Sequence, residues 1–435
     1  MNDLQLAKIE AEAFSKNRDW TGAIVAWKKV IALAAPDNST ESVVHLSRAL
    51  RMNGQWQSAE DFLRPWMDAA PDDIILLMEH AEIATAAQNN AHAIERWGKV
   101  VESGASARAY LSLARINWRL KNKTTALDQV SAGLSLFPDN LLLIEMRASL
   151  LFDNRQWLLA GDILEGLILE GKTPTHHGYN LLIRAHQKCG NLEAAKRSLD
   201  AATKANAGRP ELEKFAAELE QSVRNIRQLE DFMQTVKGQD CVVFGSAPDP
   251  TLLDPTRLDK KIITCNGSAL SLKERFQREP AMSFIHSHVL TRPNESDADV
   301  RAALAKVGHL GQIVLLHGKD PEGDLELIKR KTPGLVRFDC DYRHYILRRL
   351  LGYPLPGLDI STGAFAVAAC AAFGARSIEL AGISLNRKGH GYNANNRYRN
   401  HVTSDAALYA LLKLRGVNLI SSEPSVAMLC TNKIE

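Results

Sequence analysis

A small residue recurs through the first half of the chain at a nearly constant interval, and this spacing restricts the fold more than any other feature. Alanines that begin helix-like segments follow one another at steps of 36, 34, 33, 34 and 34 residues, at Ala23, Ala59, Ala93, Ala126, Ala160 and Ala194. Prolines recur between these segments, at Pro36, Pro71, Pro138, Pro174 and Pro210. A period of about 34 residues predicts helix pairs that bury their apolar faces against the next pair.

The repeat motif resembles the tetratricopeptide family. The segments Trp20-Thr21-Gly22-Ala23-Ile24 and Gly190-Asn191-Leu192-Glu193-Ala194-Ala195 match the opening of the second helix in that family. The resemblance covers about residues 5–208 and implies an all-α solenoid whose concave face binds a peptide or a partner helix. Most of the alanines and tryptophans are expected to be packing residues, and the sequence does not identify the ligand contacts.

A different pattern begins near residue 209. Residues 210–236 read as one amphipathic helix, with apolar residues at Leu212, Phe215, Leu219, Val223, Ile226, Leu229 and Phe232. We expect it to cap the solenoid and to connect it to a second domain. The predicted domains are therefore a repeat solenoid at 1–208, a capping and linker helix at 209–236, and a second domain at 237–435.

The second domain alternates short β-rich runs with helical segments. The predicted strands are Cys241–Gly245, Lys261–Cys265, Met282–His286, Gln312–His317, Leu335–Asp339, Ser377–Ile383 and Val417–Ser421. Such alternation predicts a mainly parallel sheet covered by helices on both faces. Ligands of these sheets bind at the carboxyl ends of the strands, so we look for chemistry there.

Composition limits the classes of partner and compartment. The net charge of +3 over 435 residues gives no general attraction to nucleic acid. We expect no signal peptide and no membrane span, because no stretch approaches the roughly 18 apolar residues that a span needs. The six cysteines are scattered without a CxxC pair, and five lie in apolar segments, which favours reduced core residues and a cytoplasmic protein.

The first two strand ends carry small and polar residues. Phe244-Gly245-Ser246-Ala247-Pro248 is a turn that lets the backbone approach a ligand closely. Thr264-Cys265-Asn266-Gly267-Ser268 places an amide donor and acceptor where a base or ribose would lie. An asparagine at a turn is equally common for structural reasons alone.

The third strand end contains two histidines, His286 and His288. We do not expect them to bind a metal, because alternate positions of a strand point to opposite faces. No carboxylate or cysteine in the sequence pattern completes a site around them.

The stretch from Asp359 to Asp405 holds the densest group of candidate residues. Ser361 or Thr362 caps a predicted helix and leaves backbone N–H groups open for a phosphate. After the strand at 377–383 comes a long loop rich in hydroxyl and imidazole groups, which we interpret as a lid. It contains Tyr392 and Tyr398 and ends at His401.

The order of these motifs resembles the bacterial sialyltransferases of glycosyltransferase family 42 and their relatives. The resemblance covers about residues 240–430 and implies a Rossmann-like glycosyltransferase domain of the GT-A-variant type. It implies an inverting, metal-independent enzyme that uses a CMP-activated nonulosonic acid and needs no cofactor. The motifs that carry it are the Gly245 turn, Cys265-Asn266, Asp359-Ile360-Ser361-Thr362-Gly363-Ala364, Ile378-Glu379-Leu380-Ala381-Gly382-Ile383, Tyr392, Tyr398, His401 and Ser421-Ser422-Glu423-Pro424-Ser425.

Residue roles follow from the resemblance. His401 matches the catalytic base, and Tyr392 and Tyr398 fall where tyrosines bind the leaving phosphate. Two residues of the first turn depart from the family pattern: Ser246 stands where an asparagine is usual, and Asp249 stands where a serine is usual. Ser246 can still form hydrogen bonds, whereas a carboxylate beside a phosphate is unfavourable. The residues expected to contact the CMP-sugar are Gly245, Ser246, Asn266, Gly267, His286, Ser361, Thr362, Gly363 and Ser425.

A role of His401 as general base is reasonable on chemical grounds, apart from the family resemblance. Imidazole titrates near neutral pH and suits a general base, and Asp405, one helical turn later, could orient it. The alternative is structural: His401 starts a helix, and Asp405 is a first-turn carboxylate that the helix dipole favours.

The combination of domains resembles flagellin glycosyltransferases that join tetratricopeptide repeats to a nonulosonic-acid transferase. We therefore expect transfer of a sugar such as pseudaminic or legionaminic acid to Ser/Thr of a protein acceptor, flagellin or a similar protein. One alternative is a capsule or lipopolysaccharide transferase that uses CMP-Kdo or CMP-sialic acid, with the solenoid as a scaffold. The other is a non-catalytic adaptor or chaperone.

Overall fold

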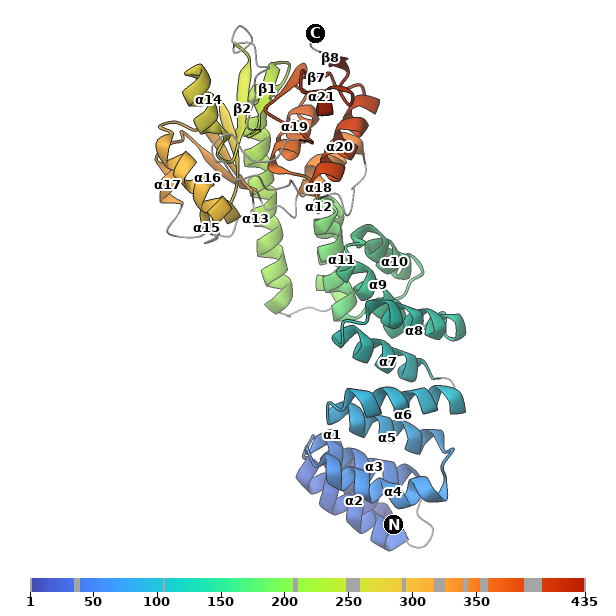
Figure 1. The fold of residues 1–435 in the computed structure, drawn as a ribbon. Helices are drawn as coiled ribbons and strands as arrows, with labels where there is room; N and C mark the ends of the chain where they lie inside the picture. The colour runs from blue at the N-terminus through green and yellow to red at the C-terminus, as the bar shows by residue number, and fades with distance from the viewer. Residues whose placement is uncertain are drawn as a thin grey trace. The chain divides into compact units, whose positions relative to one another are not determined.

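The protein divides into two compact units, Met1–Asp153 and Asn154–Glu435 (Figure 1). The structure is a computed structural model, and it describes residues 2–34, 40–104, 106–205, 210–247, 259–291, 295–316, 325–338, 343–352, 359–386 and 401–433. Each unit is described by itself below.

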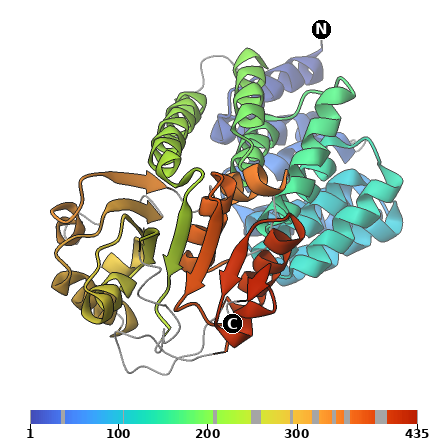
Figure 2. The ribbon, with the colours of Figure 1, turned by 90° about the horizontal axis from the view of Figure 1, so that it is seen from above.

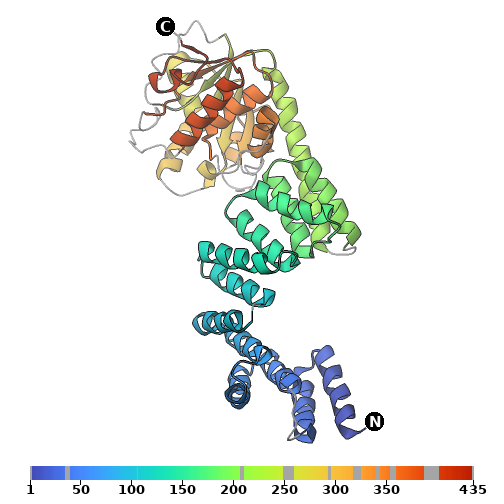
Figure 3. The same ribbon diagram turned by 90° about the vertical axis from the view of Figure 1, so that its right-hand side faces the viewer.

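The first unit is a stack of helix hairpins (Figures 1 and 3). Odd-numbered helices pack against one another, as α3 does against α5 and α7 against α9. The repeat alanines are fully buried where helices cross, so the predicted solenoid of helix pairs is confirmed. The helices are α1 (Asp3–Lys16), α2 (Trp20–Ala34), α3 (Thr40–Met52), α4 (Trp56–Ala69), α5 (Ile74–Ala86), α6 (Asn90–Ser103), α7 (Ala107–Arg119), α8 (Lys123–Leu136) and α9 (Leu141–Asp153).

The turn inside each hairpin contains one residue in the left-handed backbone region. These residues recur with the repeat, at Arg18, Gly54, Gln88, Lys121, Arg155 and Gly190, with φ between 56° and 77°. A non-glycine residue in this conformation costs about 1–2 kcal/mol, which helix packing on both sides must offset. The hairpin geometry therefore comes from the stacking of the helices and does not require a glycine at every turn.

The repeat helices continue into the second unit. Here α10 (Trp157–Leu169), α11 (His176–Lys188) and α12 (Leu192–Ala205) precede α13 (Pro210–Met233) and a short 3₁₀ turn, Gln234–Val236. The first half of α13 packs on the last hairpin, with Leu212, Phe215 and Leu219 in one cluster with its residues. Its second half enters the core of the sheet through Ile226, Leu229 and Met233. This helix therefore covers the end of the repeats and one part of the sheet at once.

The sheet is entirely parallel among the described residues, with strand order β5-β4-β3-β2-β1-β6-β7-β8. The seven predicted strands are confirmed to within two residues at their ends, and β8 is an additional short edge strand. Figure 2 shows β1, in light green, beside β6, in orange. The strands are β1 (Asp240–Phe244), β2 (Lys261–Cys265), β3 (Met282–His286), β4 (Gln312–Leu316), β5 (Leu335–Phe338), β6 (Ser377–Ala381), β7 (Leu419–Ser421) and β8 (Asn432–Lys433).

Helices cover both faces of this sheet, as a buried parallel sheet requires. Alternate residues of β1 show the two faces: Cys241 and Val243 pack with α13 and α19, whereas Val242 and Phe244 pack with α14. The helices of this part are α14 (Ser268–Phe276), α15 (His288–Thr291), α16 (Glu295–Lys306), α17 (Glu326–Lys329), α18 (Arg343–Leu351), α19 (Thr362–Ala372), α20 (Val402–Leu414) and α21 (Pro424–Ala427).

Five cysteines lie in these cores, and each is buried and free of a disulfide: Cys189, Cys241, Cys265, Cys370 and Cys430. Cys340 lies outside the described residues. Burial raises the pKa of the Cys265 thiol to about 12, which keeps it in the neutral form. In the described part of the chain, no helix combines the length and apolar character needed to cross a bilayer.

The last hairpin packs against α18 of the sheet. A side chain added at Gly190 would place its Cβ 2.4 Å from the backbone nitrogen of Tyr345. The Tyr345 hydroxyl donates to Glu230 of α13 at 2.6 Å, and Arg349 donates to the same carboxylate oxygen at 2.9 Å. The turn, α13 and α18 thus form one packed junction.

Gly190→Ala should destabilise this junction, because the new Cβ meets backbone atoms that have no room to move. Overpacking of this kind costs about 1–3 kcal/mol. Gly171→Ala is the matched control, since Gly171 also has a positive φ but no atom within 4 Å of the added Cβ. Amide hydrogen exchange of α18 should speed up in Gly190→Ala and stay near wild type in Gly171→Ala; equal exchange in the two variants would contradict this packing.

A chain truncated to residues 237–435 should fail to fold, whereas residues 154–435 should fold. The truncation removes Ile226, Leu229 and Met233 from the sheet core. Each such side chain contributes about 1.5–3 kcal/mol, so the loss is comparable with the roughly 5–15 kcal/mol stability of a whole domain. Near-UV circular dichroism during heating checks this, and cooperative unfolding of both fragments at the same temperature would contradict it.

Candidate functional site

The predicted site residues gather where the sheet reverses its order. The chain adds strands from β1 to β5 in one direction and then returns to place β6 on the other side of β1. The strand that follows β1 in the chain and the strand that follows β6 therefore lie on opposite sides of this pair, and such a reversal is where ligands of doubly wound sheets bind. The carboxyl ends of β1, β2, β3, β6 and β7 and the first turn of α19 carry nearly all the candidates.

Gly245 follows β1, and its lack of a side chain has a packing reason. Its Cβ would lie 2.5 Å from the carbonyl oxygen of Gly382 and 2.7 Å from Cγ1 of Ile383. The Gly245 N–H donates to the carbonyl of Ala381 at 2.8 Å, so the ends of β1 and β6 are held close together. The glycine is thus required by the contact between two strands, a reason distinct from the predicted approach of a ligand. Ser246 follows it and is partly exposed.

Asn266 follows β2 and has a left-handed backbone, with φ of 51°. Its side-chain oxygen accepts the N–H of His286 at 3.0 Å, and its amide nitrogen lies 3.5 Å from the hydroxyl of Thr362. The side chain therefore connects β2 with β3 and with the start of α19, as a structural turn asparagine does. The next residue, Gly267, is the N-cap of α14.

The sequence argument about His286 and His288 was wrong on orientation. Their ring centroids lie 3.8 Å apart. Residues two apart in a strand share a face, so alternation would not have separated these side chains, and β3 ends at His286 before the chain enters α15 at His288. A carboxylate is also near, with Asp297 Oδ1 at 3.8 Å from Nε2 of His288. Even so, the described residues contain no group of three or more such side chains arranged to hold a metal ion.

Ser361 caps α19, as predicted. Its hydroxyl accepts the N–H of Ala364 at 3.1 Å, and its own N–H donates to the carboxylate of Asp405 at 2.8 Å. The N–H groups of Thr362 and Gly363 have no hydrogen-bond partner among the described residues. A Cβ at Gly363 would meet nothing closer than 3.8 Å, so packing does not require this glycine. The first turn of the helix therefore presents two N–H groups to which no described residue forms a hydrogen bond.

His401 is held by a residue that sequence reasoning did not connect with it. Its Nδ1 lies 2.9 Å from the backbone carbonyl of Asp359 and 3.8 Å from the carboxylate of the same residue. A carbonyl oxygen only accepts, so Nδ1 carries the proton and, in the neutral ring, Nε2 carries the lone pair. The ring is partly exposed, and this tautomer is the one that a general base needs. Arg343 at the start of α18 holds the segment by donating to the carbonyl of Ile360 at 2.9 Å.

Asp405 was expected to orient His401 from one turn further along α20. His401 is the N-cap of that helix, and the Asp405 N–H donates to its carbonyl at 2.8 Å. The Asp405 carboxylate is buried and accepts the N–H of Ser361. Its visible effect is to fix α20 against the first turn of α19.

A third group of polar residues lies at the ends of β6 and β7. The Ser425 hydroxyl accepts the N–H of Leu385 at 3.0 Å and lies 3.3 Å from the hydroxyl of Ser384. Both hydroxyls are within 3.3 Å of the Glu423 carboxylate. Sequence reasoning selected Ser425 and missed its two partners. A signal was present, because Ser384 directly follows a predicted strand and Glu423 lies within the quoted motif.

Contacts thus link Asn266, His286, Thr362, Ser361 and Asp405 in one chain, and His401 joins them through Asp359. Tyr392, Tyr398 and Asp249 lie outside the described residues, so their positions stay predictions.

A cavity of about 570 Å³ lies at the amino-terminal ends of the strands, and the candidate site lies at their carboxyl ends. It is lined by residues at the amino ends of the strands and the loops before them, including Asp240, Lys261, Arg278, His309 and Arg376. None of the predicted site residues lines it. The Asp240 carboxylate is already engaged by Arg376 and Ser377, whose hydrogen bonds hold its pKa well below the usual range.

Comparison with known proteins gives matches to solved structures alone. No family model matches the chain, and no curated protein matches it. The chain is similar to PilW, a widely conserved type IV pilus biogenesis factor, with 13% identity, a TM-score of 0.41, and coverage of 49% of this chain and 99% of that chain. It is similar to PilF of Pseudomonas aeruginosa, with 16% identity, a TM-score of 0.39, and coverage of 49% and 95%. It is also similar to YrrB, a tetratricopeptide-repeat protein with an unusual peptide-binding site, with 13% identity, a TM-score of 0.34, and coverage of 44% and 98%. Each of these matches covers less than half of this chain.

Proposed function

We propose that this protein is a glycosyltransferase that moves a sialic-acid-like nonulosonic acid from a CMP-sugar to a serine or threonine hydroxyl of a protein acceptor. The second unit binds the donor and carries the chemistry, and the repeats select the acceptor, of which flagellin is the best candidate. The observation that carries the proposal is the open first turn of α19 at the point where the sheet reverses, which begins three residues after the carbonyl that holds His401.

The first turn of α19 suits the phosphate of the donor. The N–H groups of Thr362 and Gly363 are open among the described residues, and the positive end of the helix dipole lies there. Gly363 supports this role, because among the described residues no atom comes closer than 3.8 Å to an added Cβ, so contacts with them do not require the glycine. Asp405 accepts the N–H of Ser361, and the Ser361 hydroxyl accepts the N–H of Ala364. These bonds hold the turn in place without using the N–H groups of Thr362 and Gly363.

His401 suits the role of the general base. In the transfer, the acceptor oxygen forms a bond to the anomeric carbon while the bond from that carbon to the phosphate oxygen breaks. The acceptor proton passes to Nε2 of His401, and the electron pair of the broken bond leaves with CMP. The imidazolium that results lies near the Asp359 carboxylate, 3.8 Å from Nδ1, which favours its charge. Tyr392 and Tyr398 are proposed to donate to the departing phosphate.

The repeats supply acceptor selection in this proposal. A sugar acceptor needs only a small pocket, whereas a stack of helix hairpins offers an extended surface that suits a protein segment. Tethering this surface to the transferase raises the local concentration of acceptor hydroxyls, commonly to millimolar levels.

CMP should bind the full-length protein in preference to ATP, GDP and UDP and should raise its melting temperature. A ligand at about 100 times its Kd adds about 2.7 kcal/mol, which shifts melting by a few degrees. Gly363→Asp should abolish this shift, because the new carboxylate repels the phosphate. The variant should still fold, since the helix dipole favours a negative side chain in the first turn.

Gly363→Asn is the matched control, since it adds the same bulk without the charge and should keep most of the CMP-induced shift. Thermal-shift and calorimetric titrations measure both variants. Equal stabilisation by ATP and CMP, or unchanged CMP binding in Gly363→Asp, would argue against the proposed donor site.

His401→Ala should lower kcat for transfer by about 100-fold or more and leave CMP affinity nearly unchanged, because the base acts on the acceptor hydroxyl. His309→Ala is the control, since that imidazole lies at the opposite edge of the sheet. Mass spectrometry of the acceptor after single-turnover reactions gives the rate.

Near wild-type transfer by His401→Ala would place the base elsewhere. Strong inhibition by EDTA that Mg²⁺ reverses would contradict the metal-independent mechanism. Transfer to a glycan with no protein acceptor would favour the capsule or lipopolysaccharide alternative, and absence of any transfer with CMP-sugars would favour the adaptor.

A further inference from the structure

The surface of the odd-numbered helices in the first unit carries a cluster of arginines. Arg48 lies on α3, and Arg108, Arg115 and Arg119 lie on α7, with α5 between these helices (Figure 1). We call the side of α3, α5 and α7 that bears these four residues the arginine face. The spacing of 108, 115 and 119 places three of them along one exposed stripe of α7.

The repeat places these residues in equivalent positions. Steps of 34 and 33 residues lead from Arg48 to Glu82 and from Glu82 to Arg115, on three successive odd-numbered helices. Since odd-numbered helices form one layer, the three side chains follow one another across the stack. The arginine face is therefore a continuous feature of the solenoid and does not belong to a single helix.

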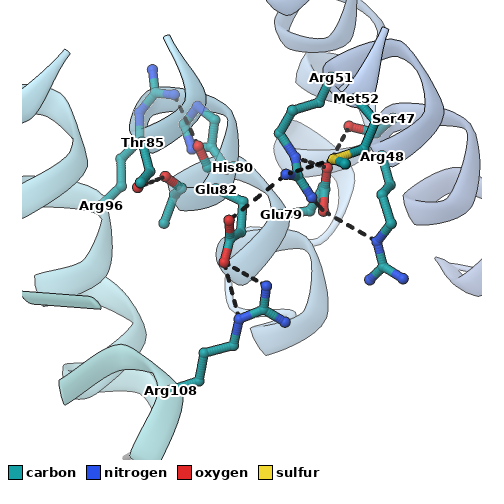
Figure 4. A network of polar contacts seen from close by, with 11 residues as sticks. Ser47, Arg48, Arg51, Met52, Glu79, His80, Glu82, Thr85, Arg96 and Arg108 are labelled. Atoms are coloured by element: carbon teal, nitrogen blue, oxygen red, sulfur yellow. Dashed lines mark hydrogen bonds and ion pairs between the residues drawn. The ribbon is translucent and has the colours of Figure 1, made fainter. Parts of the chain in front are cut away.

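The carboxylates in the middle of this face are already used (Figure 4). Glu79 has a side chain only 3% exposed, and Arg51 donates to both of its oxygens, at 2.9 and 3.2 Å. Arg51 also lies 3.7 Å from Glu82, and Arg108 donates to Glu82 through Nε at 3.0 Å. These four residues form a ladder that joins α3, α5 and α7.

The outer arginines remain accessible. Arg48 approaches Glu79 only to 4.0 Å and has a side chain 44% exposed, and the side chain of Arg108 is 53% exposed. Arg115 and Arg119 are exposed and have no ion-pair partner among the described residues. With Glu41 of α3 included, five arginines and three glutamates leave this face with a net charge of +2.

Apolar side chains border the arginines. Ile75 on α5 is 50% exposed and Leu142 on α9 is 45% exposed, and both occupy the repeat position of Arg108. A surface that combines fixed guanidinium groups with such residues matches a segment that carries carboxylates and apolar side chains together.

We propose that the arginine face binds an acidic segment of a protein partner, with Arg48, Arg115 and Arg119 contacting carboxylates and the ladder holding the three helices in register. This inference rests on the proposed role of the repeats in selecting a protein acceptor. Arginine suits this role because its planar guanidinium binds a carboxylate through two parallel hydrogen bonds.

The test uses the full-length protein and a defined probe, a fluorescein-labelled peptide in which glutamate alternates with leucine. About twelve residues suffice, since helix axes lie about 10 Å apart and an extended residue spans about 3.3 Å. Two further peptides replace glutamate with glutamine or with lysine. Fluorescence anisotropy should show binding of the glutamate peptide that weakens with added salt, and much weaker binding of the other two.

The double variant R115E/R119E should weaken binding of the glutamate peptide by about tenfold or more. The control K28E/K29E makes the same change of charge on exposed positions of α2, in the other layer of helices, and should leave binding nearly unchanged. Circular dichroism should show unchanged melting in both, because none of these four residues is in the ladder.

Equal weakening in the two double variants would mean general charge attraction and would overturn the proposal. Equal binding of the glutamate and glutamine peptides, or no binding by the wild-type protein, would also overturn it. No donor sugar is present in this assay, so its outcome is separate from that of transfer. Wild-type transfer to the protein acceptor by R115E/R119E would show that the acceptor is selected elsewhere.

Discussion

The second unit depends on the long helix α13, which packs against the last repeat hairpin with its first half and against the sheet with its second half. A repeat hairpin cannot bury its own apolar surface, so a stack of hairpins needs a final element that covers the last one. The amino-terminal half of α13 covers that hairpin through Leu212, Phe215 and Leu219, and its carboxyl-terminal half completes the core of the sheet. Since both surfaces belong to a single helix, the last repeats and the sheet are parts of one folding unit, and the chain's division falls after Asp153.

The position of the candidate site depends on the order of the strands. The return of the chain to the other side of β1 places α19 and α20 on one face of the sheet and brings their first turns together. A buried carboxylate, Asp405, joins these turns by accepting the N–H of Ser361. Burial of a carboxylate is costly unless it is hydrogen-bonded, so this contact resists disruption. The rigidity of the first turn of α19 follows from it.

The sequence predicted the elements well because their signals are local. A period of about 34 residues and short β-rich runs are visible within a few tens of residues, and the helix pairs and seven strands follow from them. The contacts of the site are different, because they join residues that are far apart in the sequence. Some of them use backbone groups, which are the same in every residue type. His401 meets the backbone carbonyl of Asp359, 42 positions earlier, and any residue type would supply that carbonyl.

The contacts of two other sites also depend on residues that the local pattern does not contain. Gly245 was interpreted as leaving room for a ligand, which stays a prediction, and its observed close contact is the carbonyl of Gly382, the residue directly after β6. The two histidines were placed on opposite faces, although residues two apart in a strand share a face, and their rings lie 3.8 Å apart. For Gly245, the strand order decides which residue becomes its neighbour.

The helix α18 contacts both the candidate site and the last repeat hairpin. At its first residue, Arg343 holds the Asp359–Ile360 segment that positions His401. Two residues later, Tyr345 lies under the Gly190 turn of the last hairpin and donates to Glu230 of α13. A helix is stiff over so short a distance, so the position of the proposed base is fixed relative to the last hairpin. The repeats that end at α12 therefore contribute to the geometry of the candidate site through packing, independently of any partner that the first unit binds.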